Sequence, residues 1–252
     1  MISIKRGLDL PISGTPQQTI EDARPVRQVA LLGPDYLGMK PTMQVREGDV
    51  VRLGQPLFDD KKSEGVRYTA PAGGTVSAIH RGAKRALQAV VLDVHDAAGA
   101  ERFDTIVPVA VAGADPAAIE AALLASGLWT ALRTRPFSRV PAPGSRPHSL
   151  FVTAIDTHPL AADPQVVIEP HAEAFGHGLD LLARLVDAPV YLCTAPDARI
   201  PEGNDARIRR ETFAGPHPAG LPGTHIHFLD PVGPSKTVWT IGYQDVIAIG
   251  RT

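Results

Sequence analysis

The stretch that decides the fold of the first part of the chain reads Val45-Arg46-Glu47-Gly48-Asp49-Val50-Val51-Arg52-Leu53-Gly54-Gln55-Pro56-Leu57-Phe58. Its apolar runs are short and β-branched, and the turn pairs Gly48-Asp49 and Gly54-Gln55 separate them. A polar tip follows at Asp59 to Gly65, and the turn residues Ala70 to Gly74 come after a further short run. The pattern predicts small-barrel or sandwich strands from Val26 to about Val94.

This order of turn pairs resembles the barrel-sandwich fold of lipoyl and biotinyl carrier domains. Lys61 and Lys62 lie near the hairpin tip at which such carriers attach their cofactor. The tripeptide that surrounds the modified lysine of carriers is missing here and the spacing to Pro71 differs, so an exposed charged turn is the favoured interpretation. A stand-alone carrier or small-molecule-binding module that uses Lys61 or Lys62 remains the alternative function.

The second part of the chain has a different periodicity. Asp115 and Pro116 open a run with apolar residues at helical spacing, which predicts one amphipathic helix to about Leu132. Prolines between Pro136 and Pro143 then predict an extended linker. Beyond the linker, strand patterns alternate with a helical pattern, which is typical of βαβ units on a mostly parallel sheet. The strands are expected at 149–155, 190–193 and 237–241, and the helix at about 170–186.

We therefore expect an α+β or α/β protein with two folded units. An N-terminal arm and a barrel-sandwich domain of the lipoyl-carrier type occupy residues 1–100, and a helical and proline-rich linker occupies 101–147. A small Rossmann-like α/β domain occupies 148–252. The chain stops after an apolar run without a polar tail, so we expect this last domain to continue in a longer protein.

Charge and hydropathy exclude several classes of function. The 252 residues include 25 Lys and Arg against 27 Asp and Glu, a formal net charge of −2, so no global field would attract nucleic acid. The N-terminus lacks the apolar core of a secretory signal. The longest charge-free apolar stretch, residues 121–132, is far shorter than the roughly 20 residues that span a bilayer. We expect no membrane span and an association with membranes only through partner subunits.

Common catalytic and cofactor motifs are missing from the sequence. Cys193 is the only cysteine, which excludes an intrachain disulfide and a thiolate cluster, and its place in an apolar strand predicts a buried, inert thiol. No Gly-x-Ser-x-Gly elbow or phosphate-loop pattern is present, and Gly176-His177-Gly178 falls inside a predicted helix.

Two further motifs leave their roles open. If the chain is extended around His225 and His227, both imidazoles point to one face, as two metal ligands could. The favoured interpretation is nevertheless a structural role of these residues and His217 in a loop braced by Pro and Gly. Asp156 and Thr157 follow a predicted strand, at the end where open α/β sheets place their sites, and a functional role and a capping role are equally open.

Four phrases together closely resemble the A subunit of the sodium-translocating NADH:quinone reductases, and the resemblance covers essentially the whole chain. The phrases are Gly7-Leu8-Asp9-Leu10-Pro11-Ile12, Ala30-Leu31-Leu32-Gly33-Pro34-Asp35-Tyr36-Leu37-Gly38-Met39, Ser126-Gly127-Leu128-Trp129-Thr130-Ala131-Leu132-Arg133-Thr134-Arg135-Pro136-Phe137 and Phe213-Ala214-Gly215-Pro216-His217-Pro218-Ala219-Gly220.

The resemblance implies a place in a respiratory complex. In that family the protein is a peripheral part of a complex that oxidises NADH, reduces ubiquinone and exports sodium, at the cytoplasmic face of the bacterial inner membrane. The family protein is longer, so the chain resembles its N-terminal portion. Integral membrane subunits and the other subunits of the reductase are the implied partners. The isolated portion is expected to be inactive, with an assembly role and a quinone-contacting role in the complex.

The resemblance also implies a degenerate nucleotide site. The fold is related to the flavoprotein subunit of proton-pumping NADH dehydrogenase, in which a glycine-rich loop holds flavin and NADH. The corresponding stretch here is Ser126 to Ala131, where Leu128 and Trp129 stand in place of glycines and would keep the backbone away from a phosphate. We expect no redox cofactor on this chain, with NAD and flavin used elsewhere in the complex.

A quinone-contacting surface is the last expectation. A quinone needs a flat apolar wall and polar donors for its carbonyl oxygens. The candidate residues are Tyr36, Met39, Trp129, Arg133, Arg135 and Phe137. In the alternative interpretation, Trp129 and Phe137 fill an interdomain core and the arginines pair with acids.

Overall fold

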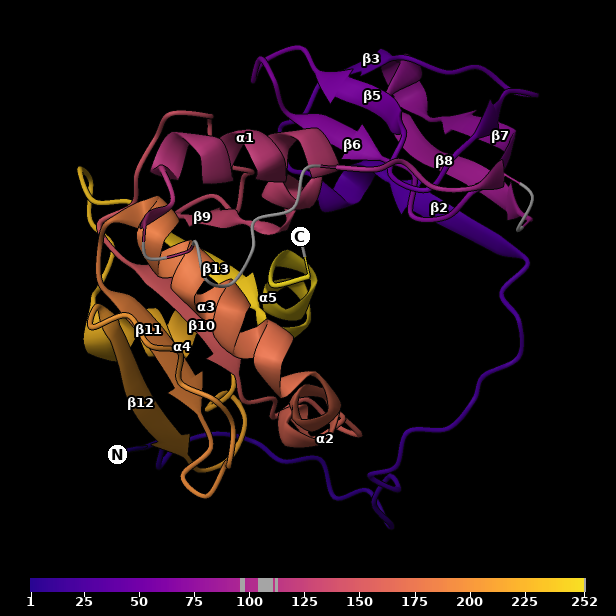
Figure 1. Cartoon of the computed structure of the whole chain (residues 1–252). Helices are drawn as coiled ribbons and strands as arrows, with labels where there is room; N and C mark the ends of the chain where they lie inside the picture. Colours follow the sequence, from indigo (N-terminus) through magenta and orange to yellow (C-terminus); the bar gives the residue numbers. More distant parts are fainter. Residues whose placement is uncertain (96–97, 104–110, 112, 252) are drawn as a thin grey trace.

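The structure, a computed structural model, describes residues 1–95, 98–103, 111 and 113–251 (Figure 1). Its described part contains a four-stranded, a three-stranded and a six-stranded sheet. The first two belong to one unit and the third to another, and a long arm without regular structure runs from one unit to the other over residues 7–27.

The first unit is a barrel-sandwich of antiparallel strands. One sheet has the order β2-β8-β7-β4 and the other has the order β3-β5-β6. Leu57, Phe58, Val90 and Leu92 are fully buried in it. This confirms the barrel-sandwich prediction. The elements are β2 (Gln28–Leu32), η1 (Gly33–Asp35), β3 (Pro41–Met43), β4 (Val50–Val51), β5 (Pro56–Asp60), β6 (Arg67–Thr69), β7 (Gly74–Arg81), η2 (Ala83–Arg85) and β8 (Leu87–Val94).

The second unit is built on the six-stranded sheet, whose order is β1-β12-β11-β10-β13-β9. All neighbours in it are parallel except β13 and β9. This confirms the α/β prediction. The strands are β1 (Ile2–Ser3), β9 (Arg133–Arg135), β10 (Leu150–Ala154), β11 (Val190–Thr194), β12 (Ile208–Ala214) and β13 (Val238–Gly242). The helices are α1 (Pro116–Ser126), η5 (Leu128–Ala131), α2 (Pro164–Ile168), η6 (Glu169–His171), α3 (Ala172–Val186), α4 (Pro222–Leu229) and α5 (Tyr243–Ile249).

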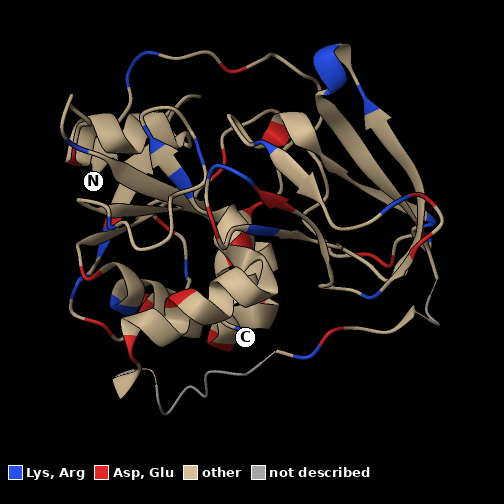
Figure 2. Cartoon of the chain, turned by 90° about the horizontal axis from the view of Figure 1, so that it is seen from above, with Lys and Arg blue, Asp and Glu red and all other residues tan. Residues whose placement is uncertain are grey.

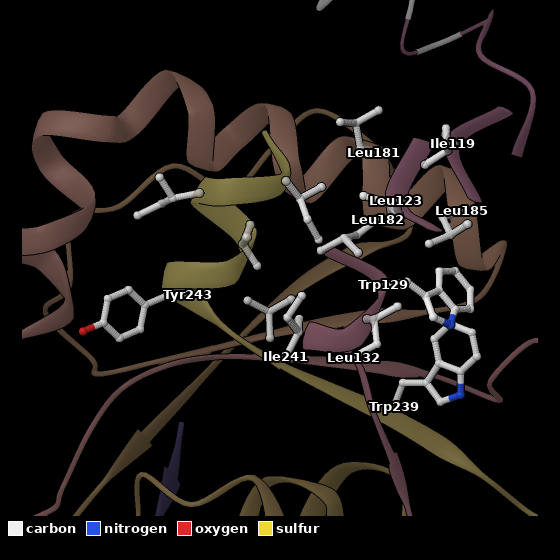
Figure 3. Packing of buried hydrophobic residues seen from close by; sticks show 14 of the residues in the cluster. Ile119, Leu123, Trp129, Leu132, Leu181, Leu182, Leu185, Trp239, Ile241 and Tyr243 are labelled. Carbon is white, nitrogen blue, oxygen red and sulfur yellow. The ribbon is translucent and has the colours of Figure 1, made fainter. Parts of the chain in front are cut away.

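Both faces of this sheet are covered, because alternate residues of its strands join different apolar clusters. Leu150 and Val152 of β10 pack in the cluster that includes α3 and α5, whereas Phe151 packs with Ile226 of α4 on the other face. On the first face the indoles of Trp129 and Trp239 meet edge to face at 5.6 Å between ring centroids (Figure 3).

Two strands of the α/β sheet come from outside residues 148–252. β1 pairs with β12 and starts the N-terminal arm, and β9 pairs with β13 and lies in the segment expected to be a linker. Residues 104–110 and 112 of that segment lie outside the described residues. The domain boundaries near 100 and 147 stay predictions.

Two local expectations were wrong. The predicted helix at 115–132 is divided at Gly127, whose positive φ of 81° ends α1, and a separate 3-10 helix, η5, follows it. The Asp115 cap is confirmed, since its carboxylate accepts from Ala117 N at 3.0 Å. His225 and His227 lie in the helix α4 and not in the expected loop braced by Pro and Gly. No helix in the described part of the chain is long and apolar enough to span a bilayer.

Candidate functional site

The strand order of the α/β unit creates a crevice between β10 and β13. From β10 the chain passes through α2 and α3 to β11 on one side, whereas α4 carries it from β12 to β13 on the other side. The order of the strands in the sheet therefore reverses between β10 and β13. Open α/β sheets bind their ligands at such a topological switch point.

A cleft of about 360 Å³ lies at this switch point. The ends of β10 and β13 form part of its wall. The rest comes from the loop after β10, from β9, and from the starts of α4 and α5. Its lining residues are Ala131, Arg133, Thr153, Ile155, Asp156, His158, Gly220, Pro222, Thr240, Ile241, Gly242, Tyr243, Gln244 and Asp245. We call it the switch cleft.

The loop after β10 is held by short hydrogen bonds. The Asp156 carboxylate accepts from the His158 backbone N–H at 2.9 Å and lies 2.6 Å from His158 Nδ1. Thr157 Oγ1 accepts from Gly220 N–H at 2.9 Å and lies 3.0 Å from His217 Nδ1. Asp156 thus has the expected capping role in its own loop, and it also lines the cleft, where a functional role stays a prediction.

Arg133 is the cation of the switch cleft, and carboxylates and aromatic rings surround it. Its guanidinium lies 5.3 Å from the centroid of the Tyr36 ring, which comes from the barrel-sandwich unit. Burial raises the pKa of Asp245, and the nearby Arg133 charge offsets part of that rise. Burial, together with the charge of Asp156, raises the pKa of Tyr243. The Tyr243 hydroxyl points away from the packed leucines (Figure 3).

One buried hydroxyl of the switch cleft has no hydrogen-bond partner among the described residues. Thr153 lies in β10, and its Oγ1 is buried and unpaired. An unpaired buried polar atom is unfavourable unless water or a ligand satisfies it. Thr153 and Arg133 are therefore the donors of the cleft that are suited to an oxygen-bearing ligand.

The six residues expected to contact a quinone do not form one surface. Arg133 lines the switch cleft, with Tyr36 against it, whereas Met39 and Tyr36 line another pocket of the barrel-sandwich unit. Arg135 is half-buried on β9, and its Nε is buried without a partner in the described chain.

Trp129 and Phe137 lie in opposite environments. The Trp129 side chain is fully buried, and its indole N–H donates to Pro141 O at 2.9 Å, so it presents no face to a ligand. Phe137 is 74% exposed, with the Arg139 guanidinium 5.8 Å from its ring centroid. The core-filling interpretation is therefore correct for Trp129 and wrong for Phe137.

The remaining candidate residues have structural surroundings. Lys61 and Lys62 are exposed after β5, and the Lys62 ammonium donates to Gly38 O at 3.0 Å. Cys193 is buried as predicted, and burial raises the pKa of its thiol. His225 is buried with Nε2 at 2.9 Å from Ala219 O, whereas His227 is exposed. In the described part of the chain, no three His, Cys, Asp or Glu side chains are placed to hold a metal ion.

Sequence reasoning missed the half of the switch cleft that β13 supplies. Thr240, Gly242, Tyr243 and Asp245 follow one another at the end of that strand and the start of α5. A signal was nevertheless available: Gly242 and Tyr243 directly follow a predicted apolar strand. Asp156 was selected because it, too, follows a predicted strand. That β13 lies beside β10 was not visible in the sequence.

The fold and the site define a class: a barrel-sandwich hybrid unit joined to a Rossmann-like α/β unit that carries a cleft at its switch point. Family models match both units. The model described as the NqrA N-terminal barrel-sandwich hybrid domain matches residues 2–95, and that described as the NqrA second alpha/beta domain matches residues 114–252. The chain belongs to the NqrA family.

Curated relatives carry the corresponding name. The A subunit of the Na(+)-translocating NADH-quinone reductase of Cellvibrio japonicus (strain Ueda107) is 60% identical over 251 residues, which is 100% of this chain and 56% of the relative. That of Pseudomonas aeruginosa (strain UCBPP-PA14) is 61% identical with the same coverage. That of Rhodopirellula baltica is 58% identical over 98% of this chain and 54% of its own length. The chain thus spans about half the length of these relatives, and the family resemblance is confirmed.

Proposed function

We propose that this chain acts as the A subunit of a sodium-translocating NADH:ubiquinone reductase. The observation that carries the proposal is its 60% identity, over its whole length, to a relative of that name. An identity of this level across both units supports the same partners as well as the same fold. The chain then works as part of the complex, and alone it has no reductase activity.

The proposed position is peripheral, at the cytoplasmic face of the bacterial inner membrane. The integral membrane subunits of the reductase hold the chain there, and the chain contributes to their assembly. NAD and flavin act on other subunits, and this chain binds no redox cofactor of its own.

The switch cleft is the proposed place of quinone contact. Arg133 N–H groups and the Thr153 hydroxyl are donors for the two carbonyl oxygens of a quinone ring, and Ile155, Ile241 and Tyr243 supply apolar walls. Of the six residues considered in the sequence, Arg133 and Tyr36 stay in this proposal. Trp129 is removed from it because its ring is buried.

A chimeric protein tests the proposed place in the complex. Residues 1–252 of this chain replace the matching portion of the Pseudomonas aeruginosa relative, which is 61% identical to it. Inverted membrane vesicles are then assayed for sodium-dependent ubiquinone reduction by NADH and for sodium uptake. We expect both activities to return to near those of the parent complex. A chimera that assembles and stays inactive would contradict the proposal.

Photo-crosslinking with an azidoquinone on the assembled complex tests the quinone contact. We expect labelling of β10, β13 or the Arg133 segment, and at least a severalfold loss of labelling in Arg133→Gln and Thr153→Val. Arg209→Gln is the matched control, because it removes an exposed arginine of β12 that does not line the cleft. Labels confined to other subunits would rule out quinone contact while leaving the place in the complex intact.

A further inference from the structure

Four cationic side chains surround a second pocket, which lies in the barrel-sandwich unit. It has a volume of about 460 Å³ and is formed by residues 33–41 and by residues 81–88 at the end of the β7–β8 hairpin. Its cations are Lys40, Arg81, Lys84 and Arg85. Figure 2 shows Lys and Arg gathered at the outer end of that hairpin. We call this site the cationic pocket.

The charge of the cationic pocket is not neutralised by neighbouring side chains. In the described part of the chain, none of its four cations takes part in an ion pair. The two segments that form it contain one acid, Asp35, so their net charge is +3. The net charge of −2 for the whole chain does not indicate this local excess of positive charge.

The turn that joins β7 and β8 carries two of the four cations. Lys84 and Arg85 have φ angles of 53° and 61°, in the left-handed region that residues with a side chain rarely adopt. Both side chains are exposed as a result of this turn. Positive φ at two consecutive residues is typical of the tight turn that closes a β-hairpin, so the turn accounts for this backbone conformation.

Part of the lining of the cationic pocket is apolar. Tyr36, Met39 and Leu87 line it, and Leu37 stands at its rim with 55% of its surface exposed. Leu32 on the adjoining β2 is also exposed. A ligand that satisfies both parts of this site carries a negative charge next to a hydrocarbon portion.

We propose that the cationic pocket binds the headgroup of an anionic phospholipid at a membrane surface. The phosphate lies among Arg81, Lys84 and Arg85, and the glycerol and the first acyl carbons lie against Leu37 and Met39. A free phosphate would leave the apolar part of the lining uncovered, whereas a phospholipid uses both parts of the pocket. Long cationic side chains on a protruding hairpin also reach a plane of phosphates without insertion of the chain into the bilayer.

The proposal goes beyond the proposed function and does not depend on it. It concerns a contact of this chain with lipid, and it is tested with the chain alone. If the chain does not bind lipid vesicles, the proposal that it belongs to the reductase still stands. If the chimera is inactive, the proposal of lipid binding still stands.

Vesicle flotation of the 252-residue chain tests the proposal. The vesicles are phosphatidylcholine alone or a mixture with roughly one-third phosphatidylglycerol, at low ionic strength because screening weakens the contact. We expect binding to the mixed vesicles only, and a loss of binding as salt is raised. Absence of binding to the mixed vesicles at low salt would overturn the proposal.

Two triple variants with the same loss of charge locate the contact. In Arg81→Gln/Lys84→Gln/Arg85→Gln we expect the partition coefficient to fall about a hundredfold, since each cation near an anionic surface contributes roughly a factor of five. The control Arg24→Gln/Arg46→Gln/Arg209→Gln removes three exposed arginines that do not line the pocket, and we expect a fall of less than about threefold. Equal losses in both variants would overturn the assignment to the pocket.

Two additional measurements check the folding of the variants and the source of the phosphate. Thermal melting checks that each triple variant is folded, and if the pocket triple is not, Lys84→Gln and Arg85→Gln singly replace it with an expected fall of about fivefold each. Competition with inorganic phosphate at constant ionic strength separates the two sources of phosphate. Full displacement from the vesicles would identify a free-anion site and overturn the lipid assignment.

Discussion

Trp129 lies in the core of the α/β unit. Its side chain is fully buried, meets Trp239 edge to face and donates its indole N–H to Pro141 O. We expect Trp129→Ala to lower the free energy of unfolding by about 3–5 kcal/mol, because a large buried ring is replaced by a cavity. Urea denaturation followed by far-ultraviolet circular dichroism measures the change. Phe137→Ala, at an exposed ring, should change it by less than about 0.5 kcal/mol. Equal effects would contradict the core assignment.

His225 gives the chain a sensitivity to acid. Burial lowers the pKa of this imidazole to about 4, against about 6.5 in an unfolded chain. As the pH falls from about 6.5 to 4, the unfolded state takes up a proton that the folded state does not, so the folded state loses up to about 3 kcal/mol of stability. Above pH 6.5 this contribution is constant.

A comparison of two histidines of the same helix isolates this effect. The free energy of unfolding is measured in urea at pH 7 and at pH 5. We expect His225→Gln to lose less stability between these two values than the wild type does, because the titrating group is gone. His227→Gln, at an exposed position of α4, should keep the wild-type dependence. The idea fails if all three proteins lose the same amount.

At the scale of elements, the end of α1 is fixed by contact with the other unit. Gly127 has a φ of 81°, and a Cβ built on it would lie 2.4 Å from Thr69 Oγ1 of β6. We expect Gly127→Ala to lower the free energy of unfolding by more than about 2 kcal/mol, since the left-handed conformation costs about 1 kcal/mol and the clash adds to it. Gly144→Ala is the control, because its φ is 77° and no atom lies within 4 Å of its Cβ. Equal losses in urea denaturation would show that the contact with β6 contributes nothing.

The elements that the sequence predicted are those with strong local signals. Asp115 and Pro116 mark the start of α1, and the apolar period of α3 is regular. β1 and β9 have two and three residues, too few for any pattern, and they form only because partner strands are available. α4 was missed because the prolines and glycines between Pro216 and Gly223 favoured a loop. As a helix, the segment packs Ile226 on the sheet face with Phe213.

At the scale of the whole molecule, the switch cleft shows which part of a site a sequence can predict. Asp156 and Arg133 were singled out because each belongs to a recognisable phrase. Their meeting with Tyr243 and Asp245 depends on the strand order, in which β13 lies beside β10 although two strands intervene in sequence. The contact of Tyr36 with Arg133 depends on how the two units pack. Neither the strand order nor the packing of the two units produces a pattern in the local sequence.

The arrangement of the whole chain also argues against a nucleotide site. The Ser126 to Ala131 stretch is folded into the end of α1 and into η5, with Trp129 in the core, so its backbone is not available to a phosphate. In the switch cleft, Arg133 is opposed by the carboxylates of Asp156 and Asp245, which would repel a pyrophosphate. The loop after β10 is Asp156-Thr157-His158, and it lacks the glycines that allow close approach of a backbone to phosphate.

We therefore expect no tight binding of NADH or FMN by this chain. Titration calorimetry with either ligand should give a dissociation constant weaker than about 1 mM, because neither phosphate nor ring has a preformed cradle. Asp156→Asn/Asp245→Asn removes both carboxylates and so tests the missing backbone cradle by itself: NADH binding should stay weak even without the repulsion. Micromolar binding to the wild type that is abolished by Arg133→Gln would place a nucleotide in the switch cleft and contradict this prediction.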